Sequence, residues 1–342
     1  MQYAKTRNYY NGAITYLSPY ISRGIISTSS IYKHLKSNFK WEESEKLIQE
    51  LAWRDYWQNV WRAVGSEIFK PIKNPQFKVM NHGVPSAVVE ANTGIEVVDI
   101  AIRHLYTSGY MHNHMRMYVA SICCNIARCD WLSCANWMYS HLFDGDLASN
   151  HLNWQWVAGT FSNKRYVANQ ENINTNFGSQ QKGTFLDIPY ESFENLDVPE
   201  VLKSTDSHLP EYSLPDIKRP VLKNQPTLIY TYYNLDPYWH KEGKYQRVLL
   251  LEPNFLKKHP VSSMCLSFVF QLAKNIPNVK IFSGSFQEIL ELIEEENLVF
   301  KEHPTQTHFK GQQEERAWLT SVVGYFPSFF KFWNQAKKEL KF

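Results

Sequence analysis

The stretch 110–159 combines residue types that could hold a flat, polar ligand. Asn113, Arg116, Met117 and Ala120 are spaced i, i+3, i+4 and i+7, so in a helix they share one face. An amide, a guanidinium and a thioether with almost no bulk form an unusual set for a face that only fills a core. Carboxylates, a further amide and three indoles belong to the same stretch: Trp131, Asp144, Asp146, Asn150, Trp154 and Trp156.

The motifs HNxxRMxxAS, DW, DGDLAxN and WQW, in this order, resemble the FAD-binding domain of the photolyase and cryptochrome family. The segments TYLSPYISRG (15–24) and ELAWRDYW (50–57) extend the match upstream, so the resemblance covers about residues 1–190. It implies an all-helical domain that binds FAD, with reduced FAD as the active form. The residues that it implies for FAD binding are Tyr3, Thr15, Leu17, Ser18, Arg54, Tyr110, Asn113, Arg116, Asp144, Asp146 and Asn150.

Within this set, the resemblance places segment 15–18 at the FAD diphosphate and Asn150 opposite the flavin N5. Hydroxyls and backbone amides are suited to phosphate oxygens. Arg116 and Asp144 could pair beside the flavin ring, and Asp146 could accept a hydrogen bond from the ring imide. From the residues alone, segment 15–18 is equally typical of a capped loop that enters a helix.

The cyclobutane-dimer photolyases of this family line their substrate pocket with a Glu, a Trp, an Asn, a Met and a second Trp. The corresponding residues here are Glu50, Trp53, Asn113, Met117 and Trp156. Two tryptophans would enclose a flipped dimer, and the Glu50 carboxyl would hydrogen-bond the pyrimidine carbonyls as they gain negative charge. The alternative for Glu50 is a surface ion pair with Arg54 one helical turn later, worth a few tenths of a kcal/mol.

Trp154 and Trp131 correspond to the inner two members of the tryptophan chain that re-reduces the flavin in this family. No Trp lies between Trp61 and Trp131, so the usual outermost member is missing, and Trp137 or a nearby Tyr is a candidate replacement. Without the resemblance, Trp131 and Trp154 would be interpreted as core rings. The catalytic residues that the resemblance implies are Glu50, Asn113, Asn150, Trp131 and Trp154.

The resemblance therefore predicts a light-driven DNA lyase, a deoxyribodipyrimidine photolyase that splits cyclobutane dimers in single-stranded or duplex DNA. The first alternative is a blue-light photoreceptor of the cryptochrome type, which has no need of the pocket residues that are intact here. A (6-4) photolyase carries His where Asn113 and Met117 stand, which argues against that reaction. A flavoprotein that binds single-stranded nucleic acid or RNA is a further alternative.

Composition limits the class of protein. A chain of 342 residues can bury a large core, and its 15% of aromatic residues suits both packed rings and the stacking of flat ligands. The formal charge of +3 allows a nucleic-acid partner without demanding one. No apolar signal region opens the chain, and no apolar run approaches the roughly 20 residues of a membrane span. The sequence predicts a cytoplasmic protein with no membrane association.

Four cysteines, Cys123, Cys124, Cys129 and Cys134, invite a metal or iron–sulfur interpretation. Their CCx4Cx4C spacing fits neither a zinc ribbon nor a ferredoxin. Buried, reduced thiols are the better prediction for a cytosolic protein, so no metal site is expected. His112 and His114 would need at least one further ligand to bind a metal.

The fold is predicted to be mainly α. Residues 1–195 form the helical domain, with helices at 42–64, 93–106 and 111–127 and a further helix capped by Ser133. A proline-rich linker follows at 196–225.

Residues 226–342 are predicted to form a small α/β unit. Strand-length apolar runs at 227–234, 247–253 and 279–286 alternate with helical segments near 261–275 and 287–297, which indicates parallel pairing. An aromatic helix closes the chain. Photolyases have an α/β antenna domain before the flavin domain, whereas this sequence starts at the flavin domain. The C-terminal unit could be a relocated counterpart, and an antenna chromophore is not expected.

Overall fold

The computed structural model describes residues 2–207, 209–211 and 214–342. The chain forms two compact units that both draw on the N-terminal quarter of the sequence. The first unit comprises Met1–Thr15, Glu45–Leu47 and Trp57–Leu209. The second comprises Tyr16–Ser44, Ile48–Tyr56 and Pro210–Phe342. The long helix α4 (Trp41–Val64) contributes residues to both units.

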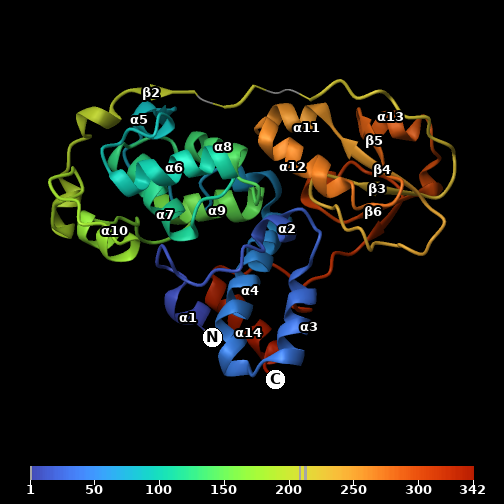
Figure 1. The fold of residues 1–342 in the computed structure, drawn as a ribbon, viewed down its shortest axis with the longest axis horizontal. Coiled ribbons are helices and arrows are strands. Elements are labelled where there is room, and N and C mark those ends of the chain that lie inside the picture. The colour runs from blue at the N-terminus through green and yellow to red at the C-terminus, as the bar shows by residue number, and fades with distance from the viewer. Residues whose placement is uncertain (1, 208, 212–213) are drawn as a thin grey trace. The chain divides into compact units, whose positions relative to one another are not determined.

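The regular secondary structure of the first unit is almost entirely helical among its described residues (Figure 1). Its α-helices besides α4 are α1 (Gln2–Thr6), α5 (Ser86–Val89), α6 (Glu96–Ser108), α7 (Asn113–Ser121), α8 (Trp131–His141), α9 (Leu147–Ala158) and α10 (Gln170–Phe177). Short 3₁₀ helices lie at Gly65–Phe69, Tyr190–Glu194 and Glu200–Leu202, and strands β1 (Val84–Pro85) and β2 (Thr205–Asp206) pair antiparallel. Helices α7, α8 and α9 pack against one another. They carry seven of the predicted site residues: Asn113, Arg116, Met117, Trp131, Asn150, Trp154 and Trp156.

Two predicted helix boundaries in this unit are wrong. The helix expected over 111–127 ends as α7 at Ser121 and continues as a π-helix over Ile122–Ile126. Single π-turns of this kind occur frequently at functional sites. Ser133 does not cap the next helix, because α8 begins at Trp131 and is capped by Asp130. The Asp130 Oδ2 atom accepts from the Ser133 backbone N–H at 2.9 Å, the standard reach of a capping carboxylate.

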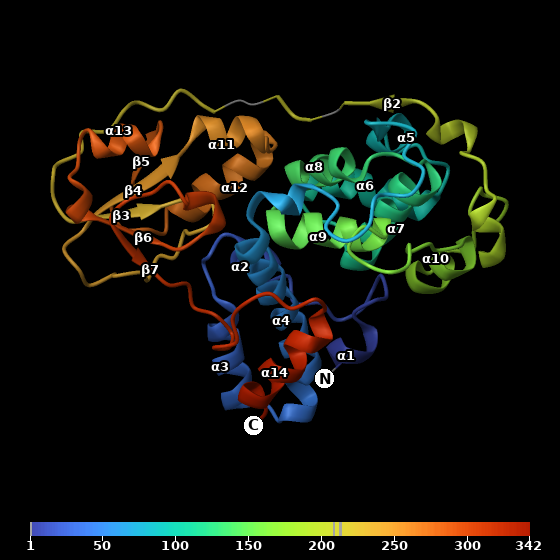
Figure 2. The same ribbon diagram turned by 180° about the vertical axis from the view of Figure 1, so that it is seen from behind.

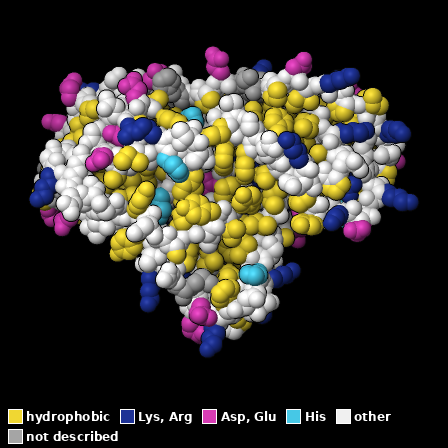
Figure 3. All heavy atoms as spheres, in the orientation of Figure 1, with side chains coloured by type: hydrophobic (Ala, Val, Ile, Leu, Met, Phe, Trp, Pro, Cys, Tyr) yellow, Lys and Arg dark blue, Asp and Glu magenta, His cyan; other side chains and the backbone are white. Residues whose placement is uncertain are grey.

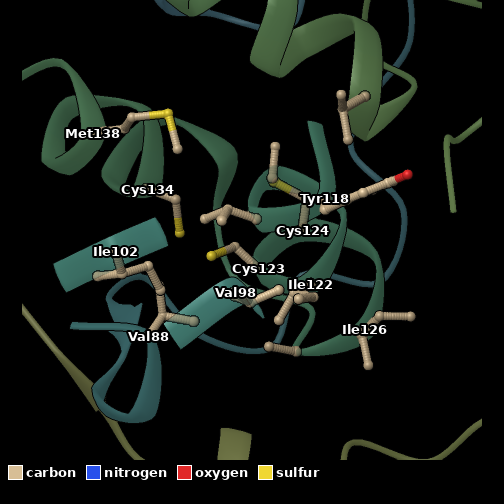
Figure 4. Packing of buried hydrophobic residues seen from close by; sticks show 14 of the residues in the cluster. Val88, Val98, Ile102, Tyr118, Ile122, Cys123, Cys124, Ile126, Cys134 and Met138 are labelled. Carbon is tan, nitrogen blue, oxygen red and sulfur yellow. The ribbon is translucent and has the colours of Figure 1, made fainter. Parts of the chain in front are cut away.

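The core of the first unit is built from aliphatic side chains, aromatic rings and four thiols (Figure 4). Cys123, Cys124, Cys129 and Cys134 are free and buried, and burial raises the pKa of the Cys124 and Cys134 thiols well above the usual value. Among the described residues, no group of three or more His, Cys, Asp or Glu side chains is placed to hold a metal ion. These thiols therefore act as small apolar core residues.

The second unit contains a five-stranded sheet (Figure 2). Its strands are β3 (Thr227–Tyr230), β4 (Gln246–Leu251), β5 (Lys280–Ser283), β6 (Leu298–Lys301) and β7 (Gln312–Glu314), in the order β5-β4-β3-β6-β7. Every neighbouring pair is parallel, as the alternation of strand and helix signals predicts. The sequence indicated three of these strands but not β7, which is a three-residue polar segment, nor β6, although β6 is as long as β3 and β5.

Helices from distant parts of the sequence complete the second unit. They are α2 (Ser18–Ser22), α3 (Thr28–Asn38), α11 (Pro253–Lys258), α12 (Ser263–Ala273), α13 (Phe286–Leu290) and α14 (Phe329–Leu340), with 3₁₀ turns at Glu295–Asn297 and Pro304–Gln306. Arg23, fully buried, links α2 to the sheet: it donates to the Tyr232 carbonyl at 3.1 Å and lies 3.9 Å over the Tyr232 ring. Domain boundaries at 195 and 226 stay a prediction, although residues 16–44 and 48–56 make their contacts with the C-terminal part.

Asp55 joins three segments of the second unit. Its carboxylate accepts from the Thr28 hydroxyl at 3.1 Å and from the Leu319 backbone N–H at 2.7 Å. The side chain is buried, and loss of hydration raises the pKa of its carboxyl from 3.8 to about 6 despite these hydrogen bonds. The folded protein therefore binds more protons at this group than the unfolded chain does between pH 4 and 6.

We predict that Asp55 makes the protein less stable as the pH rises from about 4 to about 6, with the full loss present above that range. The shift corresponds to about 3 kcal/mol at most, at about 1.4 kcal/mol per pKa unit. In Asp55→Asn, which keeps an acceptor for the Leu319 N–H, the free energy of unfolding should vary less across this range. Thermal and urea unfolding at pH 4 to 7 would measure this, with exposed Asp216→Asn as the control. Parallel curves for wild type and Asp55→Asn would contradict the prediction.

Candidate functional site

The predicted ligand face lies on helix α7. Asn113 is its first residue and is exposed, Arg116 and Met117 are half-buried, and Ala120 is buried. The face therefore runs from solvent into the core over two turns. The preceding residue, His112, caps the helix through Nδ1, which accepts from the His114 backbone N–H at 3.2 Å. Burial, and then the proximity of His114, lowers the pKa of the His112 imidazole, so it stays neutral near pH 7.

Arg116 and Asp144 form an ion pair, as the sequence predicts. Arg116 Nη2 lies 3.0 Å from Asp144 Oδ1, and Arg116 Nε donates to the Met111 carbonyl at 2.8 Å. Both side chains are largely shielded, with exposed fractions of 21% and 8%. Two bonds thus fix the plane of the guanidinium, and its remaining N–H groups have no partner among the described residues.

The turn Asp144-Gly145-Asp146 joins α8 to α9. A Cβ atom on Gly145 would lie 2.9 Å from the carbonyl oxygens of Leu142 and Tyr139, so only glycine fits this close approach. Asp146 caps α9: its Oδ1 accepts from the Ser149 backbone N–H at 2.7 Å and from the Ser149 hydroxyl. The turn thus sets the positions of both carboxylates relative to α9.

Asp146 has a buried partner that sequence reasoning missed. Gln58 of α4 donates through Nε2 to Asp146 Oδ2 at 2.7 Å, and both side chains are buried. The spacing in the sequence could have indicated Gln58. It lies eight residues after Glu50 and four after Arg54, so it falls on the same face of the helix. Asp146 is therefore a structural anchor, whatever it contacts on a ligand.

Asn150 lies one turn into α9 and is half-buried. Its Nδ2 donates to the Ala135 carbonyl of α8 at 2.9 Å. This bond assigns the Nδ2 atom to the end of the amide that faces α8. The Oδ1 atom, at the other end, can therefore accept a further hydrogen bond. No described residue donates to it.

The tryptophans of this unit fall into two groups. Trp131 and Trp154 are buried, with exposed fractions of 1% and 2%, and the Trp131 ring meets the buried His151 ring edge-on at 6.2 Å. Trp156, two residues after Trp154 on the same helix, is 36% exposed. Its ring lies 5.9 Å from that of Tyr166. The two groups thus differ in their access to solvent.

Trp137, the candidate replacement for the missing outermost tryptophan, is fully buried. Its indole N–H donates to the Tyr106 hydroxyl at 3.1 Å, and this hydroxyl donates to the Val89 carbonyl. Trp137 thus has a half-buried tyrosine as its polar neighbour. Its role in electron delivery stays a prediction.

Glu50, Trp53 and Arg54 belong to the second unit. Arg54 Nη2 donates to the Ser22 hydroxyl at 2.5 Å, which fastens α4 to the end of α2. The Trp53 ring is stacked on Phe329 of α14, with centroids 3.7 Å apart and planes 9° apart. Nothing in the sequence signalled Phe329, since 276 positions separate the two residues.

The remaining predicted FAD contacts lie near the N-terminus and before α7. Tyr3 on α1 and Tyr110 are half-buried, and Thr15 is exposed. Leu17 and Ser18 stand at the start of α2, with Tyr16 before them in the left-handed region at φ +54°. Tyr3, Thr15 and Tyr110 belong to the first unit, and Leu17 and Ser18 to the second.

The residues predicted for the substrate pocket are divided between the two units. Asn113, Met117 and Trp156 lie on α7 and α9, which pack together in the first unit, and Glu50 and Trp53 lie on one face of α4 in the second. A single pocket formed by all five stays a prediction.

The chain is similar to known proteins over part of its length. Residues 47–187 match the model of the FAD-binding domain of DNA photolyase. A deoxyribodipyrimidine photo-lyase of Streptomyces griseus is 31% identical over 171 residues, which are 45% of this chain and 34% of that protein. A cryptochrome DASH of Synechocystis sp. is 32% identical over 172 residues, 48% of this chain and 35% of that protein. The chain thus spans about a third of the length of these relatives.

Two solved structures superpose on part of this chain. A cryptochrome from Synechocystis sp. superposes with a TM-score of 0.47 at 27% identity, covering 59% of this chain and 44% of that one. A class III photolyase from Agrobacterium tumefaciens superposes with a TM-score of 0.42 at 30% identity, covering 46% of this chain and 34% of that one.

Among the described residues, no helix has the length and apolar character needed to cross a membrane.

We predict that Asp146→Ala destabilises the protein more than Asp130→Ala does. Both aspartates cap a helix, and losing a cap costs about 1 kcal/mol. Only Asp146 also satisfies a buried amide, that of Gln58, which would cost a further 1–3 kcal/mol or so when left unpaired. Urea unfolding followed by far-UV circular dichroism would compare the two variants. Equal losses would show that the bond to Gln58 contributes nothing.

Proposed function

We propose, from the match of residues 47–187 to the FAD-binding domain of DNA photolyase, that the protein is a light-driven DNA repair lyase. FAD is the cofactor of that domain. The substrate would be DNA that carries a cyclobutane pyrimidine dimer, and the reaction would split the cyclobutane ring. The reaction and substrate rest on the residues described above.

The polar groups of the first unit fit a flavin. Arg116 presents N–H groups without a protein partner beside the shielded Asp144 carboxylate, which suits the polar edge of a ring. The Asn150 Oδ1 atom, held by the bond of its own amide to Ala135, suits a protonated ring nitrogen. Arg116, Asp144 and Asn150 would therefore hold and orient the ring, with Asp146 fixing the helix that carries Asn150.

The observation that carries the proposal is the exposure of Trp156. Trp131 and Trp154 are buried as core rings are, whereas Trp156 keeps 36% of its surface open on the same helix as Trp154. Trp156 is thus a partly open indole on α9, and α9 packs against α7, the helix that carries the exposed amide Asn113 and the half-buried thioether Met117. Such an indole suits stacking on a base that has left the DNA stack.

In the proposed reaction, the chain's residues bind and orient the dimer. In the first unit, Trp156 would stack on a flipped pyrimidine, and Asn113 would hydrogen-bond the pyrimidine carbonyls as these gain negative charge. The same two roles are proposed for Trp53 and Glu50 of the second unit. When bound and reduced, FAD supplies the electron that light moves to the dimer, and takes it back after the ring has split. Trp154 and Trp131, which are buried, would pass electrons toward the flavin.

The net charge of +3 is modest for a DNA-binding protein, and side chains of both charges occur on the face drawn in Figure 3. General attraction to phosphates would then contribute little, so contacts to the lesion itself would have to give selectivity. This favours a substrate whose bases are already easy to unstack, as in a single strand.

A blue-light photoreceptor is the second candidate. The observation that favours it is the 32% identity to a protein named cryptochrome DASH, beside the 31% identity to a protein named deoxyribodipyrimidine photo-lyase. A receptor without repair activity would use the flavin and the buried tryptophans but not the open Trp156.

We predict light-dependent repair by the photoreduced protein. Mixed with an oligonucleotide that carries one cyclobutane thymine dimer, single-stranded or duplex, it should restore thymine absorbance under near-UV or blue light and not in the dark. The ratio of the two rates would give the strand preference. No recovery by protein that holds reducible FAD would contradict the lyase and favour the photoreceptor.

We further predict that Glu50→Gln lowers repair per absorbed photon by about tenfold to a hundredfold, while the bound FAD per protein stays unchanged. A neutral amide keeps the size of the side chain but cannot share a proton with the pyrimidine carbonyl. Glu42→Gln, an exposed change in the first turn of the same helix, is the matched control. Loss of FAD from Glu50→Gln would show that Glu50 serves the cofactor instead.

A further inference from the structure

The C-terminal segment 319–333 holds the part of α4 that carries Trp53. Three contacts within the second unit make this connection. The Asp55 carboxylate accepts from the Leu319 N–H at 2.7 Å, the Tyr56 hydroxyl donates to the Phe326 carbonyl at 3.1 Å, and the Trp53 ring lies against Phe329. Trp53, Asp55 and Tyr56 lie within one turn of α4. The C-terminal segment therefore holds this short stretch of helix through three separate contacts.

The rings of Trp53, Phe329 and Trp333 form a stacked series, and the contact between Trp53 and Phe329 is the closer of its two steps. Its centroids are 3.7 Å apart at 9°, and Trp333 continues the series at 6.2 Å and 12° from Phe329. Phe329 and Trp333 are buried, with exposed fractions of 2% and 4%. Trp53 itself is only half-buried. A fixed inner ring thus supports an outer ring that retains accessible surface.

We propose that Phe329 is a positioning residue for the dimer site, because it fixes the plane of the Trp53 indole before substrate binds. This rests on the proposed function, in which Trp53 stacks on the lesion. A tryptophan that is already ordered loses less conformational freedom on binding, which improves affinity without a new contact to the ligand. The assignment places part of the substrate site in residues 319–333, outside the region 47–187 that matches the family.

The test measures binding in the dark by the FAD-loaded protein. Its ligands are a single strand with one cyclobutane thymine dimer and the same strand without it. Phe329→Leu, which keeps an apolar side chain but removes the ring, should weaken dimer binding by about threefold to tenfold, the range expected for an aromatic pair. Binding to the undamaged strand and FAD content should not change. Phe329→Tyr, which restores a ring, should bind the dimer within about twofold of wild type.

Two controls separate positioning from general stability. Phe330→Leu changes the exposed neighbour of Phe329 on the same helix and should leave dimer binding unchanged. In a Trp53→Leu background, Phe329→Leu should cause no further loss, since the ring that it positions is absent. Equal weakening on both strands, or an undiminished effect without Trp53, would overturn the proposal. Should Phe329→Leu not fold, Phe329→Met replaces it with a flexible apolar side chain.

A second readout does not depend on DNA. The near-UV circular dichroism lost on Trp53→Leu measures the contribution of the Trp53 indole. This loss should be smaller when Trp53→Leu is made in the Phe329→Leu protein than in the wild type, because an unsupported indole has no fixed orientation. An undiminished signal would overturn the positioning of Trp53 whatever the DNA result. If the wild-type protein does not distinguish the two strands, the proposed function fails and the substrate role of Phe329 fails with it. The dichroism then shows separately whether the ring contact exists.

Discussion

The buried carboxylate of Asp146 is the interaction on which the first unit most depends. It caps α9 through Ser149 and satisfies the amide of Gln58 on α4, so one side chain sets the start of one helix and ties it to another. The Asp144-Gly145-Asp146 turn that carries it also presents Asp144 to Arg116. Asn150, Trp154 and Trp156 all follow on α9, and their positions derive from this anchor.

Helix α4 plays the corresponding part for the second unit. Its residues 53–56 contact α3 and the C-terminal segment through a stacked ring, a buried carboxylate and a hydroxyl. These contacts join residues near the start of the chain to residues near its end. Burial of Asp55 raises the pKa of its carboxyl to about 6, so this junction is also where stability should respond to mild acid.

Local patterns predicted about half of the α-helices of the described residues and one side-chain pairing. The i, i+3, i+4 spacing on α7 and the pairing of Arg116 with Asp144 were both visible in the sequence, since each depends on helix geometry and on two adjacent motifs. The cap of α8 was misplaced because Ser133 and Asp130 are both good capping residues, and only the backbone decides which one precedes the first turn. The strands β6 and β7 gave no strand signal, because β7 consists of three polar residues and β6 has only three consecutive apolar residues.

The sequence by itself determined which residue types could form a flavin site and their order along the chain, because motif spacing is a local property of the chain. Only the tertiary structure decided which of these side chains are open and which are buried. Trp154 and Trp156 are two residues apart and equally apolar, yet one packs into the core and the other stays open. It likewise decided that Phe329 supports Trp53, because a contact across 276 positions depends on how the whole chain packs and leaves no local trace.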